Sequence, residues 1–119
     1  MTDQQSDIAQ LMQELRQFAQ ARDWEQFHSP KNLSMALSVE AAELLEHFLW
    51  MNGQASYALG EARHQLVSYE VADIFIYLLR ICDQLDIDLV KVTREKMAIN
   101  EQRYPAEKVK GSAKKYSEY

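Results

Sequence analysis

The sequence predicts an all-α fold, an antiparallel bundle of four helices in a single domain over residues 1–119. Three observations predict it. The chain has 119 residues, of which 47% are apolar, and this suits one domain with one core. It has only three Gly and two Pro, too few for the many turns of an all-β protein. Four segments are expected to be helical, and the first two of them repeat apolar residues at spacings of three and four, the period of an amphipathic helix.

The first helix is expected from about Asp7 to Arg22, with Ser6 as its N-cap. A connector follows with the sequence DWEQFHSPKNL, and three of its residues are aromatic: Trp24, Phe27 and His28. Two interpretations of these rings remain open. They plug the end of the bundle, or they form a stacking wall for the base of a ligand.

The second helix is expected from about Leu33 to Met51, after a break at Pro30 and before a stop at Asn52 and Gly53. The third is expected over 61–85. Its centre, VADIFIYLLRIC, is apolar almost all round, which is typical of a helix that is buried on several sides. This helix therefore lies either at the centre of the bundle or in an oligomer interface.

The fourth helix is expected to start after Asp86 or Asp88 and to end near Tyr104, before Pro105. A polar, basic tail follows from about residue 106, and we expect it to be mobile or ordered only by docking. The single cysteine, Cys82, lies in the apolar stretch of the third helix, so we expect it to be packed in the core.

The net charge of −5 argues against binding to a nucleic-acid polymer. Acidic residues outnumber basic ones up to residue 89, and basic residues dominate beyond it. This asymmetry suits either a site with a cation at one end and an anion at the other, or a tail that is simply solvated. The polar start MTDQQSDIAQ is not typical of a signal peptide, and no apolar run is long enough to span a membrane. We therefore expect a cytoplasmic protein without membrane partners.

Two carboxylate pairs stand out. Glu40 and Glu43 lie on the second helix, and Glu70 and Asp73 lie on the third. A spacing of three places both members of a pair on one helical face. If both pairs face the interior, four anions meet there, which requires a counter-ion or protonation. Hard oxygen ligands without His or Cys suit Mg²⁺ or Mn²⁺, and Mg²⁺ commonly takes further ligands from phosphates.

Two other interpretations of these acids remain open. The pairs are also common on solvated helix faces, and Glu46 extends the first row towards such a face. A di-iron carboxylate bundle needs two ExxH motifs, and the chain has one, Glu61 with His64.

The sequence resembles the MazG-like family of all-α nucleoside triphosphate pyrophosphohydrolases. The signature is ExxE on the second helix followed, after 26 intervening residues, by ExxD on the third. Further segments resemble the dCTP pyrophosphatase branch of this family: FHSPKNL at 27–33, HFLW at 47–50, DIFIY at 73–77, KMAIN at 96–100, RYP at 103–105 and KGSAKKY at 110–116. The resemblance covers about residues 20–117.

The resemblance implies a Mg²⁺-dependent enzyme that cleaves a nucleoside triphosphate between the α- and β-phosphates, as a house-cleaning activity of the nucleotide pool. The preferred substrate would be dCTP or a modified dCTP, with dUTP or a damaged nucleotide as the alternative. The resemblance also implies a homodimer or homotetramer with sites between subunits. A non-catalytic helical oligomerisation module is the competing interpretation.

Carried over by position, the resemblance assigns metal coordination to Glu40, Glu43, Glu70 and Asp73. It assigns the base and sugar pocket to Trp24, His28, Trp50 and Tyr77. It assigns contacts with phosphates or sugar to Lys96, Asn100, Arg103 and Tyr104, with Lys114 and Lys115 adding to them from the tail. Many MazG proteins have the doubled acid EExxE, and here Val39 replaces the first acid, as in the dCTP branch. Glu40 or Glu43 is then the candidate to orient the attacking water.

Overall fold

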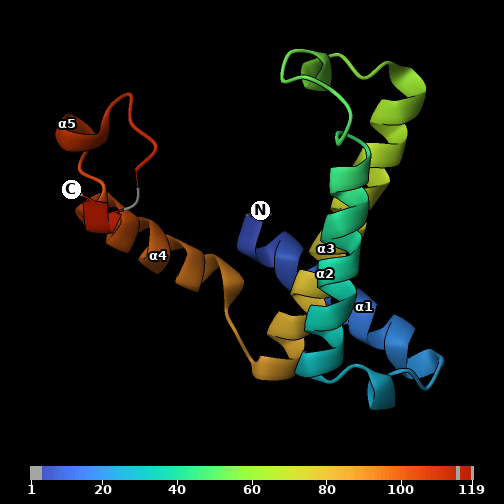
Figure 1. Ribbon diagram of the computed structural model, residues 1–119. Helices are drawn as coiled ribbons and strands as arrows, with labels where there is room; N and C mark the ends of the chain where they lie inside the picture. Colours follow the sequence, from blue (N-terminus) through green and yellow to red (C-terminus); the bar gives the residue numbers. More distant parts are fainter. Residues whose placement is uncertain (1–3, 115, 119) are drawn as a thin grey trace. The chain divides into compact units, whose positions relative to one another are not determined.

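The computed structural model describes residues 4–114 and 116–118, and all regular secondary structure in those ranges is helical (Figure 1). The chain divides into two compact units, Met1–Asp86 and Ile87–Tyr119. The first contains α1 (Gln4–Ala21), η1 (Glu25–Phe27), α2 (Pro30–Glu46), η2 (Ala55–Tyr57) and α3 (Glu61–Leu85). The second contains α4 (Leu89–Arg103), α5 (Ala106–Val109) and η3 (Tyr116–Glu118). The all-α prediction is confirmed.

In the first unit, α3 packs against both α2 and α1, and α2 runs beside α3 in the opposite direction (Figure 1). The core lies where the three helices meet. Its buried apolar side chains are Ala19 from α1, Leu33 from α2, and Leu79 and Cys82 from α3. Cys82 is buried as expected, and burial raises the pKa of its thiol.

The two ends of α2 differ from the sequence prediction. The helix begins at Pro30, because Ser29 Oγ accepts a hydrogen bond from the backbone N–H of Asn32 and Pro is favoured in the first turn. Pro30 therefore starts the helix and does not break the chain ahead of it. The helix also ends earlier, at Glu46, because the chain tightens into turns in which the N–H of Phe48 bonds to the carbonyl of Leu45.

The other helix bounds agree closely with the prediction, except at the N-terminus. α3 spans the expected residues, and Asp88 caps α4 by accepting a hydrogen bond from Lys91 N–H. The expected cap at Ser6 is wrong, because α1 begins at Gln4 and Ser6 lies within it. Gln is a good helix former, and this favours the extra residues at the start of α1.

The second unit also has more structure than the sequence predicted. The tail contains the short helix α5, which begins directly after Pro105. None of the helices in the described part of the chain is both long and apolar enough to cross a bilayer.

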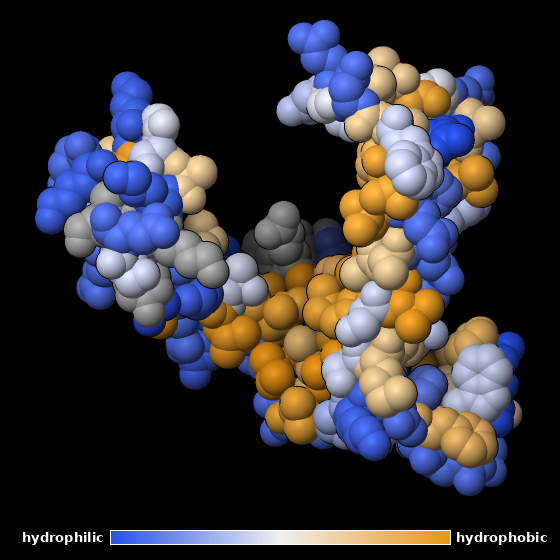
Figure 2. All heavy atoms as spheres, viewed as in Figure 1, coloured by the Kyte–Doolittle hydropathy of each residue, from blue (hydrophilic) through white to orange (hydrophobic). Residues whose placement is uncertain are grey.

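Several large apolar side chains of α2 and α3 are exposed on the single chain, and hydrophobic residues gather along these helices (Figure 2). On α2 they are Met35, Val39 and Leu45. On α3 they are Leu66, Tyr69, Val71, Phe75, Leu78 and Leu85. Exposed apolar surface of this extent is typical of surfaces that bind another protein chain.

Candidate functional site

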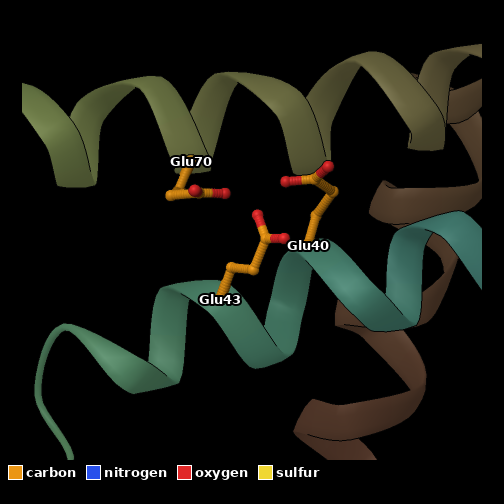
Figure 3. Close-up of side chains that lie close together, drawn as sticks. All are labelled: Glu40, Glu43 and Glu70. Atoms are coloured by element: carbon orange, nitrogen blue, oxygen red, sulfur yellow. The ribbon is translucent and has the colours of Figure 1, made fainter.

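Three carboxylates converge between α2 and α3. Glu40 and Glu43 come from α2, Glu70 comes from α3, and the side chains point towards one another (Figure 3). One carboxylate oxygen of each lies within 4.8 Å of those of the other two. We call these residues the acidic cluster. The spacing of three on α2 places Glu40 and Glu43 one turn apart on the face that α3 covers.

The acidic cluster is electrostatically unfavourable without a cation or a proton. Glu40 Oε2 and Glu70 Oε2 are buried and meet no hydrogen-bond donor in the described ranges. The contact of Glu40 with Glu70, its partial burial and the nearby charge of Glu43 raise the pKa of Glu40 to about 7. Buried oxygens that lack donors are suited to a cation, and a set made only of oxygen ligands fits Mg²⁺ or Mn²⁺.

Asp73, the fourth predicted ligand, lies one turn further along α3 and is not one of the three residues whose oxygens converge. It lines a neighbouring cavity of about 240 Å³ between α1, η1 and α3. We call this cavity the aromatic pocket. Its other lining residues are Leu15, Phe18, Ala19, Trp24, His28, Ile76, Tyr77 and Arg80.

The aromatic pocket brings together three of the residues predicted to surround the base. Trp24 packs edge-on against Phe18, with ring centroids 5.8 Å apart, and its centroid lies 6.4 Å from that of His28. Tyr77 lines the same cavity. Its pKa is raised first by burial and then by the charges of Glu40 and Asp73. Tyr77 therefore lies between the acidic cluster and the aromatic pocket.

Sequence reasoning missed Arg80, a buried basic side chain that lines this pocket together with Asp73. Arg80 is only 2% exposed, and it donates to His28 Nδ1 at 3.3 Å and to Asp83 Oδ2 at 2.8 Å. A third contact joins its Nη2 to Glu25 Oε1 at 3.5 Å. The signal was present in the sequence. Asp73, Tyr77 and Arg80 are spaced by four and three residues, so that they share one face of α3.

Trp50 is not part of this pocket. It follows α2 in the turn region and is 93% exposed. The structure therefore does not bring Trp50 beside the aromatic residues of this pocket.

The predicted phosphate contacts belong to the second unit. Lys96, Asn100 and Arg103 lie on the exposed surface of α4, and Tyr104 caps its end. Asn100 and Tyr104 line a surface hollow together with Arg94, Met97, Ala98 and Glu101. Lys114 is exposed in the tail, and Lys115 lies outside the described residues.

Comparisons with known proteins identify the family. The MazG-like family matches residues 35–119, and so includes the acidic cluster, α3 and α4. The chain is 39% identical over 114 residues to dCTP pyrophosphatase 1 of Homo sapiens, and equally similar to that of Rattus norvegicus. The match covers 94% of this chain but only 65% of either relative.

A solved structure agrees with this relationship. A pyrophosphatase from Archaeoglobus fulgidus superposes with a TM-score of 0.80 at 37% identity, over 88% of this chain and 98% of that one. Sequence and structure therefore agree that the chain belongs to the MazG-like family.

Proposed function

We propose that this protein is a Mg²⁺-dependent nucleoside triphosphate pyrophosphohydrolase that converts dCTP, or a modified dCTP, to the monophosphate and pyrophosphate. The observation that carries the proposal is the acidic cluster beside the aromatic pocket. The acidic cluster offers carboxylate oxygens to a metal ion, and the aromatic pocket offers aromatic rings to a nucleotide base. Membership of the MazG-like family and the similarity to proteins named dCTP pyrophosphatase support the same reaction.

In the proposed reaction, water attacks the α-phosphorus. A new P–O bond forms, the bond to the α–β bridging oxygen breaks, and pyrophosphate leaves. Mg²⁺, or Mn²⁺ in its place, would neutralise the phosphates and stabilise the charge that develops on their oxygens. Glu40, Glu43, Glu70 and Asp73 would hold it.

Within that arrangement, the acidic cluster also offers the general base. Glu40 or Glu43 would accept the proton of the attacking water, because a carboxylate that is hydrogen-bonded to water can take its proton as the new bond forms.

Trp24, His28 and Tyr77 would bind the base and sugar in the aromatic pocket. We expect Lys96, Asn100, Arg103 and Tyr104, with Lys114 and Lys115 from the tail, to contact the phosphates. Positive charge placed there would stabilise the leaving pyrophosphate.

We further propose that the protein is a homodimer or homotetramer. The exposed apolar side chains of α2 and α3 support this, because apolar surface that gathers on the outside of a chain commonly marks a surface that binds another chain. Trp50, which is highly exposed on the protomer, would then contribute to a site formed with a second copy. A cytoplasmic location stays a prediction.

The test is a panel of nucleoside triphosphates, with kcat/KM measured for each and the products identified as monophosphate and pyrophosphate. We expect hydrolysis in MgCl₂, none in EDTA, and the highest kcat/KM for dCTP or a modified dCTP. A higher value for dUTP or a damaged nucleotide would replace the base assignment. No hydrolysis of any triphosphate would favour the helical oligomerisation module.

Matched variants test the metal ligands in the same assay. Glu43→Gln and Asp73→Asn are expected to lose Mg²⁺-dependent hydrolysis and to keep the helical circular-dichroism spectrum. Glu46→Gln is the control, because Glu46 is exposed at the end of α2 and lies outside the acidic cluster. Full activity in both Glu43→Gln and Asp73→Asn would refute the assignment of these two residues as metal ligands.

A further inference from the structure

We propose that Asp83 is a positioning residue for the aromatic pocket: through Arg80 it holds His28 in the tautomer that offers an Nε2–H donor to a ligand. The pocket would then select a ligand edge that presents a hydrogen-bond acceptor to that donor. The inference deepens the proposed function and rests on it, because it takes the ligand to be the base of a nucleotide.

The tautomer follows from the chemistry of the contact between Arg80 and His28. Arg80 Nε lies 3.3 Å from His28 Nδ1, and a guanidinium can only donate hydrogen bonds. Nδ1 must therefore be the acceptor, and a neutral imidazole then carries its proton on Nε2. Burial and the positive charge of Arg80 also lower the pKa of His28, whereas the charge of Glu25 opposes them.

Asp83 fixes Arg80 in place because it is itself held from a second helix. Its Oδ2 accepts from Arg80 Nη1 at 2.8 Å. Arg16 of α1 donates to the same carboxylate through Nε at 3.0 Å and through Nη2 at 2.5 Å. Such a two-point contact restricts both direction and distance. Hydrogen bonds therefore connect Arg16 on α1, through Asp83, to Arg80 at the pocket.

The backbone of His28 is fixed as well. Gln84, the neighbour of Asp83 on α3, donates its Nε2 to the carbonyl of His28 at 2.9 Å. Ser29 follows directly and caps α2. The imidazole is therefore oriented from two sides, by Arg80 at the ring and by Gln84 at the backbone.

The charged and titratable groups that surround His28 come from η1 and α3, whereas α1 lines the pocket with Leu15, Phe18 and Ala19. Arg80 and Asp83 lie on α3, Glu25 lies on η1, and Asp73 and Tyr77 line the same cavity. Among the residues that the structure describes, Arg80 alone forms a hydrogen bond with the imidazole. Arg80 is therefore the group that determines which ring nitrogen is protonated.

A fixed donor discriminates between ligands. A base edge that presents an acceptor to Nε2–H gains a hydrogen bond, whereas an edge that presents another donor leaves both groups unpaired in a partly desolvated cavity. Cytosine has an acceptor at its ring N3, where uracil has an N–H. If N3 faces His28, this contact favours cytosine over uracil.

The first experiment determines the tautomer by ¹⁵N NMR of the histidine side chains in the intact protein. In the wild type we expect His28 to be neutral with the proton on Nε2. In Arg80→Gln and Asp83→Asn we expect a mixture of the two tautomers, and we expect the pKa of His28 to move towards its ordinary value. Asp86→Asn is the matched control, since Asp86 is an exposed carboxylate at the end of the same helix.

The second experiment compares the kinetics of the same proteins with dCTP. We expect Asp83→Asn to raise KM about tenfold, because the loss of one hydrogen bond to the ligand weakens binding by about that factor. We expect kcat to stay within about twofold of the wild-type value, because Asp83 does not contact the reacting atoms. A purely structural role would lower the amount of folded enzyme without this split between KM and kcat.

Arg16→Gln is the second variant, for use if Asp83→Asn does not fold. The Arg16 side chain is 45% exposed, so we expect this variant to fold. We expect the same changes, smaller in size. A wild-type His28 with its proton on Nδ1 would overturn the proposal, and so would variants with an unchanged tautomer and KM. If no triphosphate is hydrolysed, the proposed function fails, and the NMR result alone decides whether Asp83 positions His28.

Discussion

Neutralising one carboxylate of the acidic cluster should stabilise the metal-free protein and remove its response to Mg²⁺. The change is Glu40→Gln, which keeps the shape of the side chain and removes its charge. The amide can also donate a hydrogen bond to Glu70, a contact that two ionised carboxylates cannot make. A metal ligand is expected to destabilise the metal-free protein and yet to be required for metal binding.

The magnitude follows from the pKa of Glu40, which the acidic cluster raises from 4.5 to about 7. At about 1.4 kcal/mol for each tenfold change in proton affinity, ionising Glu40 at pH 8 would destabilise the fold by roughly 3 kcal/mol. Glu40 is partly reached by solvent, which screens such interactions, so we expect about 1–2 kcal/mol. The Gln variant should be more stable than the wild type by that amount.

The sign of the pH dependence is fixed by the direction of the pKa change. A carboxyl group with a raised pKa destabilises the folded state only when it must ionise there. The difference between wild type and variant should therefore be small below pH about 4.5, grow as the pH rises, and be complete above about 7.

The assay is urea unfolding followed by circular dichroism, at one protein concentration because oligomers depend on it. In EDTA at pH 8 we expect the variant to have the larger free energy of unfolding. In Mg²⁺ at about a hundredfold excess over its Kd we expect the wild type to gain about 2.7 kcal/mol and the variant to gain little. Glu46→Gln should respond to Mg²⁺ as the wild type does.

Two results would refute this reasoning. One is a Glu40→Gln variant that is no more stable than the wild type at pH 8 without metal. The other is a variant that Mg²⁺ stabilises as strongly as the wild type, which would place the metal elsewhere.

Three further predictions concern the pocket and the core. Trp24→Ala should raise KM for dCTP about tenfold or more, because base stacking on an aromatic ring contributes about 1–3 kcal/mol; an unchanged KM would return Trp24 to a packing role. Leu79→Ala should destabilise the protein by about 2–5 kcal/mol in urea unfolding, since Leu79 is 1% exposed; a loss below about 1 kcal/mol would contradict the core assignment. Arg16 and Arg80 lower the pKa of Asp83, so its stabilising effect should be complete above its ordinary pKa of 3.8 and disappear as the pH falls through the lowered value. Unfolding of wild type and Asp83→Asn across acidic pH checks this, and a difference that persists at the lowest pH would contradict it.

Much of the fold was predictable because local signals agreed. The long apolar run of α3 and the capping Asp88 of α4 correctly located those helices. The start of α2 was predicted wrongly, because Pro30 was interpreted as a break although Pro suits the first turn of a helix. Its end was also predicted too late, since the tight turns after Glu46 are formed by backbone bonds that residue types do not reveal.

The sequence alone determined the all-α class and the spacing that places Glu40 beside Glu43 on one face, because both depend on the helical period. Only the tertiary structure decided which of the acids meet. It brought Glu70 to that pair and Asp73 to the aromatic pocket instead, since the packing of α3 on α2 determines which turns face each other. It also placed Arg80 against His28 and Asp83 against Arg16, contacts between residues up to 67 positions apart that no local pattern specifies.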